Sequence, residues 1–200
     1  KLRKVQYKFK FGDDECLACH SDEKLKGTID GKPHSVFTER SDLYSSAHKK
    51  LTCVMCHSNV TRESERPCEH AGKVDCASCH AEAVAQHEKG IHGKLAAQGS
   101  EHAPDCRFCH GTHTIKTLAD RDSPVNVRNI PELCARCHRE GEQAASIYTG
   151  TQHDIIANYG MSIHGKGLIE SGLIVTAVCT DCHTAHMPLP KDDPESSVHH

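Results

Sequence analysis

The chain has 200 residues, of which 13 are Cys and 18 are His, whereas aromatic residues make up only 4% and Trp is absent. Its 24 basic and 27 acidic side chains nearly balance, which excludes the strongly basic surface typical of nucleic-acid-binding proteins. A chain this polar buries too little apolar side-chain surface to offset the conformational entropy that folding costs. We therefore expect a component other than side chains to supply much of the core.

In chain order, residues 1–11 (KLRKVQYKFKF) alternate in a way that predicts an exposed edge strand. They do not form a signal peptide, so we interpret this start as mature or internal, with any export signal removed. Residues 80–98 and 137–149 are rich in Ala, Glu, Gln and Lys and predict short helices. Between them, NIPELCARCH resembles a helix start with Pro131 in its first turn.

Elsewhere Gly, Pro, Asp and Ser recur every few residues. The longest apolar stretch, GLIVTAVC, is far shorter than the roughly 18 residues that a transmembrane helix needs. The fold class predicted is mostly coil with short α-helices and little or no sheet, without a transmembrane segment.

Twelve of the cysteines fall into six frames of the form Cys-x-x-Cys-His. Numbered 1 to 6, the frames are CLACH (16–20), CVMCH (53–57), CASCH (76–80), CRFCH (106–110), CARCH (134–138) and CTDCH (179–183). Chance placement at this composition predicts about 0.07 such frames. The frames therefore require a chemical explanation.

Three chemistries compete for these frames. Disulfides use cysteine pairs but give no reason for a His after every second Cys. Structural zinc uses paired Cys-x-x-Cys sequences, to which an adjacent His is an optional extra. Covalent haem attachment needs all three residues, because two thiols form thioethers to the vinyl groups and the His binds the iron. We interpret the frames as six sites for haem c.

The proposed thioether residues are Cys16, Cys19, Cys53, Cys56, Cys76, Cys79, Cys106, Cys109, Cys134, Cys137, Cys179 and Cys182. The proposed proximal iron ligands are His20, His57, His80, His110, His138 and His183.

With these frames the chain resembles the multihaem c-type cytochromes, in particular class III-like respiratory cytochromes of the cytochrome c3 superfamily type. The resemblance implies one domain over residues 1–200 packed around six covalent haems, little regular secondary structure, and electron transfer outside the cytoplasm, in the periplasm or at the cell surface. The porphyrins would provide the buried surface that the side chains lack.

The frames occur in three two-haem modules, at about 12–60, 72–118 and 130–190. A spacer His recurs in each module, in YSSAHKK, KGIHGK and MSIHGK, and a second His follows the frame His by three residues in CHGTH and CHTAH. The first module has Val60 at that second position. A segment near the end, DPESSVH, matches DLYSSAH of the first spacer.

These patterns select the distal iron ligands. The six proposed are His48, His92, His113, His164, His186 and His199, with His70 and His34 first in reserve and His87, His102, His153 and His200 after them. Met ligation would raise the reduction potential, but the three Met are expected to pack, leaving bis-His haems of low potential. Cys68 is interpreted as a leftover thiol, with an intermolecular disulfide or a third attachment sulfur as alternatives.

Full bis-His ligation favours an electron carrier rather than an enzyme. The expected partners are a quinol-linked donor, a terminal reductase or another cytochrome, and the surplus histidines leave open self-association into a filament. If the spacing between successive frames continued past residue 200, another frame would follow, so the hypothesis that this chain is a fragment of a longer cytochrome also stays open. Two alternatives remain. One is a multihaem nitrite or hydroxylamine oxidoreductase with an open iron, for which Val60 is the hint. The other is the haem subunit of a membrane quinol complex.

Overall fold

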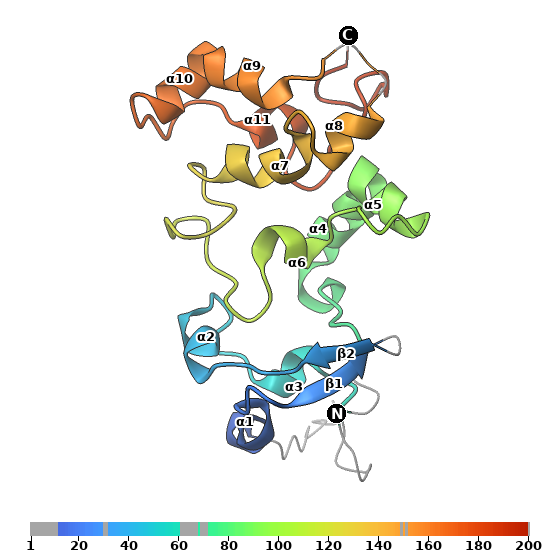
Figure 1. Ribbon diagram of the computed structural model, residues 1–200, viewed down its shortest axis with the longest axis vertical. Coiled ribbons are helices and arrows are strands. Elements are labelled where there is room, and N and C mark those ends of the chain that lie inside the picture. Colours follow the sequence, from blue (N-terminus) through green and yellow to red (C-terminus); the bar gives the residue numbers. More distant parts are fainter. Residues whose placement is uncertain are drawn as a thin grey trace, which may run out of the picture. The chain divides into compact units, whose positions relative to one another are not determined.

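The computed structural model describes residues 12–29, 32–60, 68, 72–148, 150 and 152–199 (Figure 1). The chain divides into two compact units, Lys1–Ser78 and Cys79–His200. The described residues form short helices and a single two-stranded sheet, which confirms the prediction of helix and coil with little sheet. The edge strand predicted at 1–11 lies entirely outside the described residues, which begin at Gly12.

The first unit carries frames 1 and 2. Its elements are α1 (Asp13–His20), β1 (Lys26–Ile29), β2 (Lys32–Ser35), α2 (Arg40–Ser45) and α3 (Cys53–Cys56). The two strands form an antiparallel hairpin with Lys26 opposite Ser35. The Asp13 carboxylate accepts the Cys53 N–H at 2.8 Å, and this hydrogen bond ties the start of α3 to α1. Frames 1 and 2 are thereby held together.

The second unit contains the remaining helices. They are α4 (Ala77–Lys89), whose first two residues belong to the first unit, α5 (Ile91–Ala97), α6 (Cys106–His110), α7 (Ile130–His138), α8 (Gln143–Ile147), α9 (Ile155–Met161), α10 (Ile163–Ile169) and α11 (Cys179–His183). In the described part of the chain, no helix is both long and apolar enough to cross a membrane.

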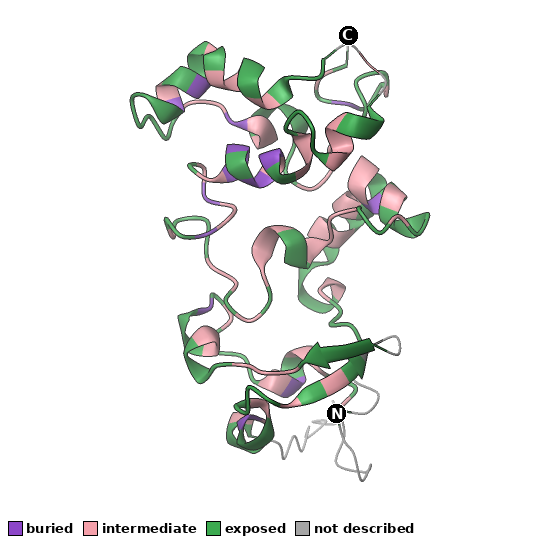
Figure 2. Ribbon diagram, in the orientation of Figure 1, coloured by how far each residue is buried: buried purple, intermediate pink, exposed green. Residues whose placement is uncertain are grey.

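A small apolar core lies where α7, α10 and the start of α11 meet. It consists of Ile130, Leu168 and Val178, and Cys134 and Cys179 pack against it. The buried residues of Figure 2 concentrate on α7 of this unit, while much of the remaining surface is exposed. The amphipathic face of α7, which begins with Pro131 in its first turn as expected, therefore organises the unit.

Two helix corners have the same construction. The helix expected over 80–98 is instead broken at Gly90, between α4 and α5. The Gly90 N–H is shared between the carbonyls three and four residues earlier, as is the Ser162 N–H between α9 and α10. After each corner comes Ile-His-Gly-Lys, in which the glycines Gly93 and Gly165 are buried. At this corner the second and third modules share a local structure as well as a sequence.

The helix expected over 137–149 is wrong in its first part. α7 ends at His138, because Arg139 is extended with ψ of 149°. Gly141 then takes a φ of +84°, which is available to glycine but not to a helix. Only Gln143–Ile147 (α8) is helical.

Three loops share a buried serine, at Ser46, Ser123 and Ser196. The N–H of each donates to the carbonyl three residues earlier, and its carbonyl accepts the N–H three residues later. The loops of Ser123 and Ser196 follow the last frames of the second and third modules, frames 4 and 6. The loop of Ser46 precedes frame 2. This turn is a second structural repeat, which the sequence indicates only through scattered serines.

The corner between α9 and α10 provides a test of the fold. A Cβ on Gly165 would overlap the Tyr159 carbonyl, whereas a Cβ on Gly160, in α9, would meet nothing within 4 Å. We expect Gly165→Ala to lower the free energy of unfolding by about 2 kcal/mol or more. Gly160→Ala, the matched control, should raise it by up to about 1 kcal/mol. Urea unfolding followed by circular dichroism measures both, and equal effects would contradict the close packing of this corner.

Candidate functional site

Each frame coincides with a helical turn. The helices α3, α6 and α11 consist of little else, α1 and α7 end with a frame, and α4 begins with one. Side chains at positions i, i+3 and i+4 of a helix share one face, so the two thiols and the imidazole of a frame point the same way. The turn ends at the histidine each time. Even within α4, His80 leaves the helical conformation, with φ of −116° and ψ of 41°.

None of the thirteen cysteines, which all lie within the described residues, forms a disulfide. In the first unit the thiols of Cys16 and Cys53 hydrogen bond to one another, as do those of Cys134 and Cys179 in the second. Burial raises the pKa of Cys53 to about 12, and its contact with Cys179, together with burial, raises that of Cys134. The leading cysteines of frames 1 and 2, and of frames 5 and 6, therefore lie side by side.

Two pairs of imidazoles lie near each other with tilted rings. The ring centroids of His92 and His138 are 6.3 Å apart, and those of His110 and His186 are also 6.3 Å apart. A metal between two imidazoles needs two metal–nitrogen bonds of about 2 Å, and each nitrogen lies about 1.2 Å from its ring centre. The expected separation is thus about 6.4 Å. In both pairs the spacing fits axial ligation of one iron.

The protonation of these rings suits the same role. Burial lowers the pKa of His92 to about 4, helped by the neighbouring His138. Burial likewise lowers the pKa of His110 and His138. At His92, His110 and His138 the lowered pKa favours the neutral imidazole, which is the form that binds a metal.

Other candidate ligands are oriented by a hydrogen bond at Nδ1. The Nδ1 of His20 donates to the Val36 carbonyl at 2.7 Å, and the Nδ1 of His164 lies 3.4 Å from the Thr176 hydroxyl. Such a bond fixes the ring and leaves Nε2 for a metal, which is the usual arrangement around metal-binding histidines. The sequence does not indicate that Val36 or Thr176 orients a histidine. Val36 contributes only its backbone carbonyl, and Thr176 lies 12 residues after His164.

The hydrogen bonds place His199 one residue out of register with His48. The buried Ser196 corresponds to Ser46, because each hydroxyl accepts the N–H two residues later, from Val198 at 3.4 Å and from His48 at 3.1 Å. Val198, rather than His199, therefore occupies the position of His48. The match of the two Ser-Ser-x-His segments is displaced by one.

The position of His199 is instead that of Asn126. Its Nδ1 donates to the Lys191 carbonyl at 3.1 Å, and the Asn126 side chain donates to the Leu118 carbonyl at 2.7 Å, in both cases eight residues earlier. His199 therefore closes its loop as Asn126 does. Iron ligation through Nε2 of His199 stays a prediction.

The remaining candidates lie in varied surroundings. His48 and His113 are half-buried, and His164 is exposed at the second residue of α10. His34, in reserve, is exposed on β2, and His70 and His200 lie outside the described residues. His87 donates from Nε2 to the Pro104 carbonyl at 3.0 Å, so that nitrogen is already occupied.

Cys68 lies beside frame 1. Its exposed thiol is 3.9 Å from the Nε2 of His20, and it is also among the groups that raise the pKa of Cys16, where burial has the largest effect. The sequence offered no indication of this proximity. The three interpretations of Cys68, as a leftover thiol, part of an intermolecular disulfide or a third attachment sulfur, all stay predictions.

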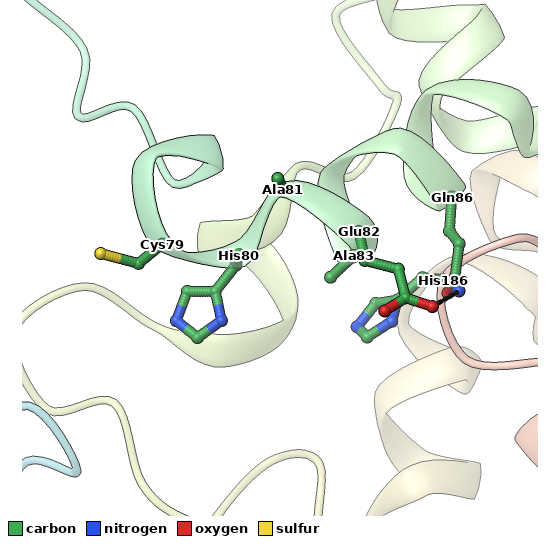
Figure 3. Close-up of a pocket in the computed structure, with 7 residues that line it drawn as sticks. All are labelled: Cys79, His80, Ala81, Glu82, Ala83, Gln86 and His186. Atoms are coloured by element: carbon green, nitrogen blue, oxygen red, sulfur yellow. Dashed lines mark hydrogen bonds between the residues drawn. The ribbon is translucent and has the colours of Figure 1, made fainter.

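An open pocket of about 360 Å³ adjoins frame 3. Figure 3 shows the rings of His80, from the first turn of α4, and His186, from the segment after α11, among its lining residues. Glu82 and Gln86, joined by a hydrogen bond of 3.4 Å, contribute polar atoms. No group of three or more His, Cys, Asp or Glu converges as a metal cluster in the described ranges, whereas axial binding of a haem iron needs only two donors.

Neighbouring frames also touch. The Arg136 guanidinium of frame 5 lies over the Phe108 ring of frame 4, 5.8 Å from its centroid. Frame 4 is followed by Gly111 at φ of +80° and frame 6 by Thr184 at +63°. A β-branched residue is strained in this region, so the surrounding structure imposes the same turn on both frames. That turn leads to His113 in one and to His186 in the other.

Asp105 is a positioning residue of frame 4 that the sequence analysis missed. As the N-cap of α6 its carboxylate accepts the Phe108 N–H at 3.1 Å and also pairs with Arg107. We expect Asp105→Ala to lower the free energy of unfolding by about 1 kcal/mol. Asp105→Asn keeps the cap but loses the exposed ion pair, and should cost much less. Chemical unfolding compares the two, and an equal loss in both would assign the effect to the ion pair.

Comparison with known proteins adds no family to this picture. No family model, curated protein or solved structure matches the chain. The chemistry of the site is therefore argued from the chain itself: from the six repeated frames, their common helical turn, and the two imidazole pairs with the spacing of a metal between them.

Proposed function

We propose that the protein is a hexahaem c-type cytochrome that carries electrons outside the cytoplasm. The observation that carries this proposal is the two pairs of neighbouring imidazoles, His92 with His138 and His110 with His186, whose ring centroids are 6.3 Å apart in each pair. In each pair one ring is the histidine of a frame and the other is one of the histidines chosen as a distal ligand. Metal spacing and attachment frame thus coincide at two independent places.

When bound, haem iron supplies one-electron redox chemistry. Two thiols and one imidazole of each frame would hold the group, through two thioethers and one bond to the iron. A second imidazole on the opposite face, as at His92 and His186, leaves no iron position for a substrate. Such a site passes electrons without binding the donor or acceptor at the metal.

The contacts between frames support transfer from haem to haem. In the first unit the thiols of Cys16 and Cys53 bring frames 1 and 2 together. In the second unit Phe108 and Arg136 join frames 4 and 5, and the thiols of Cys134 and Cys179 join frames 5 and 6. Groups anchored at adjoining turns lie close, so an electron entering one can move along the row.

Charge and location follow from the cofactor. Each haem adds two propionates to a chain that is already slightly acidic, at −3. The holoprotein would attract basic patches on its redox partners, which are a quinol-linked donor, a terminal reductase or another cytochrome. With covalently attached haem the protein would belong in the periplasm or at the cell surface, where assembly into a filament is a variant of the same function.

An enzyme with an open iron is the second candidate, and one observation favours it. In the first module Val60 stands where frames 4 and 6 are followed by His113 and His186. An iron lacking its distal ligand would bind small molecules such as nitrite or hydroxylamine. A haem subunit of a membrane quinol complex shares the electron-carrying role and differs only in its partners.

Haem content and spin state test the proposal. The protein, exported and matured with covalent haem, should contain six haems per chain in the pyridine haemochrome assay, and the Cys53→Ser, Cys56→Ser double variant should contain five. Electron paramagnetic resonance of the oxidised protein should show low-spin iron only. Stoichiometric zinc without haem would refute the cytochrome. A high-spin signal that shifts with nitrite or cyanide would favour the enzyme.

A further inference from the structure

We propose that two irons join the second and third modules in opposite directions: His92 of the second module ligates the iron of frame 5, and His186 of the third module ligates the iron of frame 4. This inference rests on the proposed function and assigns to each of these haems a distal ligand from the other module. The repeat alone selects these histidines as ligands but does not say which iron each one binds.

The ring geometry gives the assignment. His92 faces His138, the frame 5 histidine, at a centroid distance of 6.3 Å and an interplanar angle of 47°. His186 faces His110, the frame 4 histidine, at 6.3 Å and 31°. Both distances match the roughly 6.4 Å expected for two imidazoles on one metal. In both pairs the frame histidine nearest to the distal candidate therefore belongs to the other module.

The backbone holds the two distal histidines beside each other. The Ile91 N–H donates to the Pro188 carbonyl at 2.9 Å, so the corner between α4 and α5 rests on the segment that follows His186. A Cβ on Gly90 would come within about 3.2 Å of the His186 carbonyl and the Met187 Cα, as close as a side chain can tolerate. One backbone contact thus positions both ligands.

The attachment frames are adjacent as the crossed arrangement requires. Arg136, between the cysteines of frame 5, covers the ring of Phe108, between the cysteines of frame 4. Each module then supplies a proximal ligand to one iron and a distal ligand to the other.

Local geometry explains why His186 serves another module. It follows the frame 6 histidine, His183, by three residues, and the positive φ of Thr184 turns the chain away between them. His183 would ligate the iron of frame 6, and a histidine only three residues away would be too closely tethered to ligate the same iron from the other side. His186 is therefore free to bind an iron that another frame carries.

The crossed ligation has a testable signature in haem spin state. Oxidised His92→Ala should convert one of the six haems from low-spin to high-spin, as counted by electron paramagnetic resonance. In a protein that lacks haem 5, through Cys134→Ser and Cys137→Ser, the same His92→Ala change should add no high-spin haem. In a protein that lacks haem 3, through Cys76→Ser and Cys79→Ser, it should still add one. Lys94→Ala, at an exposed side chain of the same helix α5, is the control and should add none in any background.

The reciprocal experiment uses His186. Its replacement by Ala should add one high-spin haem in the full protein and none when Cys106→Ser and Cys109→Ser remove haem 4. A high-spin haem that persists without haem 4 but disappears without haem 3 would assign His186 to His80, across the pocket of Figure 3, and overturn the proposal.

Two readouts keep failure of the inference distinct from other failures. His92→Met retains an axial donor, so it should stay low-spin with a raised potential at a single haem, even if His92→Ala folds poorly. The pyridine haemochrome count tests the proposed function separately, because six haems with unchanged spin state in His92→Ala would overturn only the crossed ligation. A protein without haem would overturn both.

Discussion

The shortage of buried apolar side chains is the constraint on which the rest of the structure depends. Among the described residues the main core cluster comprises only Ile130, Leu168 and Val178, with a few partly buried neighbours. Contacts of this size cannot by themselves offset the ordering of a unit that runs from residue 79 to 200. Helices stay short, the attachment turns remain near the surface, and the space between them belongs, under the proposed function, to porphyrin. Folding and cofactor binding would then be a single process.

Within the second unit, crossed ligation would give that process a specific order. A module that lacks its neighbour has proximal histidines but lacks the distal ligand of one iron, so neither module is complete alone. The hydrogen bond from Ile91 to Pro188 and the stacking of Arg136 on Phe108 bring the partners together without metal. Iron ligation would then complete an arrangement that these two contacts already hold. The ligands would therefore move little when the iron gains or loses an electron.

Sequence reasoning located what is local and missed what depends on distant contacts. Six identical frames and the first turn of α7 at Pro131 are written in consecutive residues, so they were readable directly. The break at Gly90 was not, because Ala-rich residues on both sides favour one continuous helix. Composition also predicts a helix directly after His138, because it does not indicate that the chain turns at Gly141.

The candidate ligands show the same division. The spacer pattern placed His92 on the list, yet nothing in the spacing directs it to His138 rather than to His80 or His110, because that choice depends on how modules fold against one another. The sequence match between DPESSVH and DLYSSAH is shifted by one residue from the structural match for a related reason. Two adjacent serines look alike in sequence, and only hydrogen bonding tells which of them is the buried one.

The paired corners of α4–α5 and α9–α10 have a consequence for how such chains diversify. Both present a histidine at the second residue of a helix, followed by a glycine whose Cβ would collide with the carbonyl of the preceding helix, at His87 or Tyr159. Under the proposed function the histidine could change together with its haem, whereas any side chain in place of the glycine would disrupt the packing of the corner. In a lineage that loses a haem, the glycine should therefore outlast the ligand, leaving a structural trace of an iron that is no longer bound.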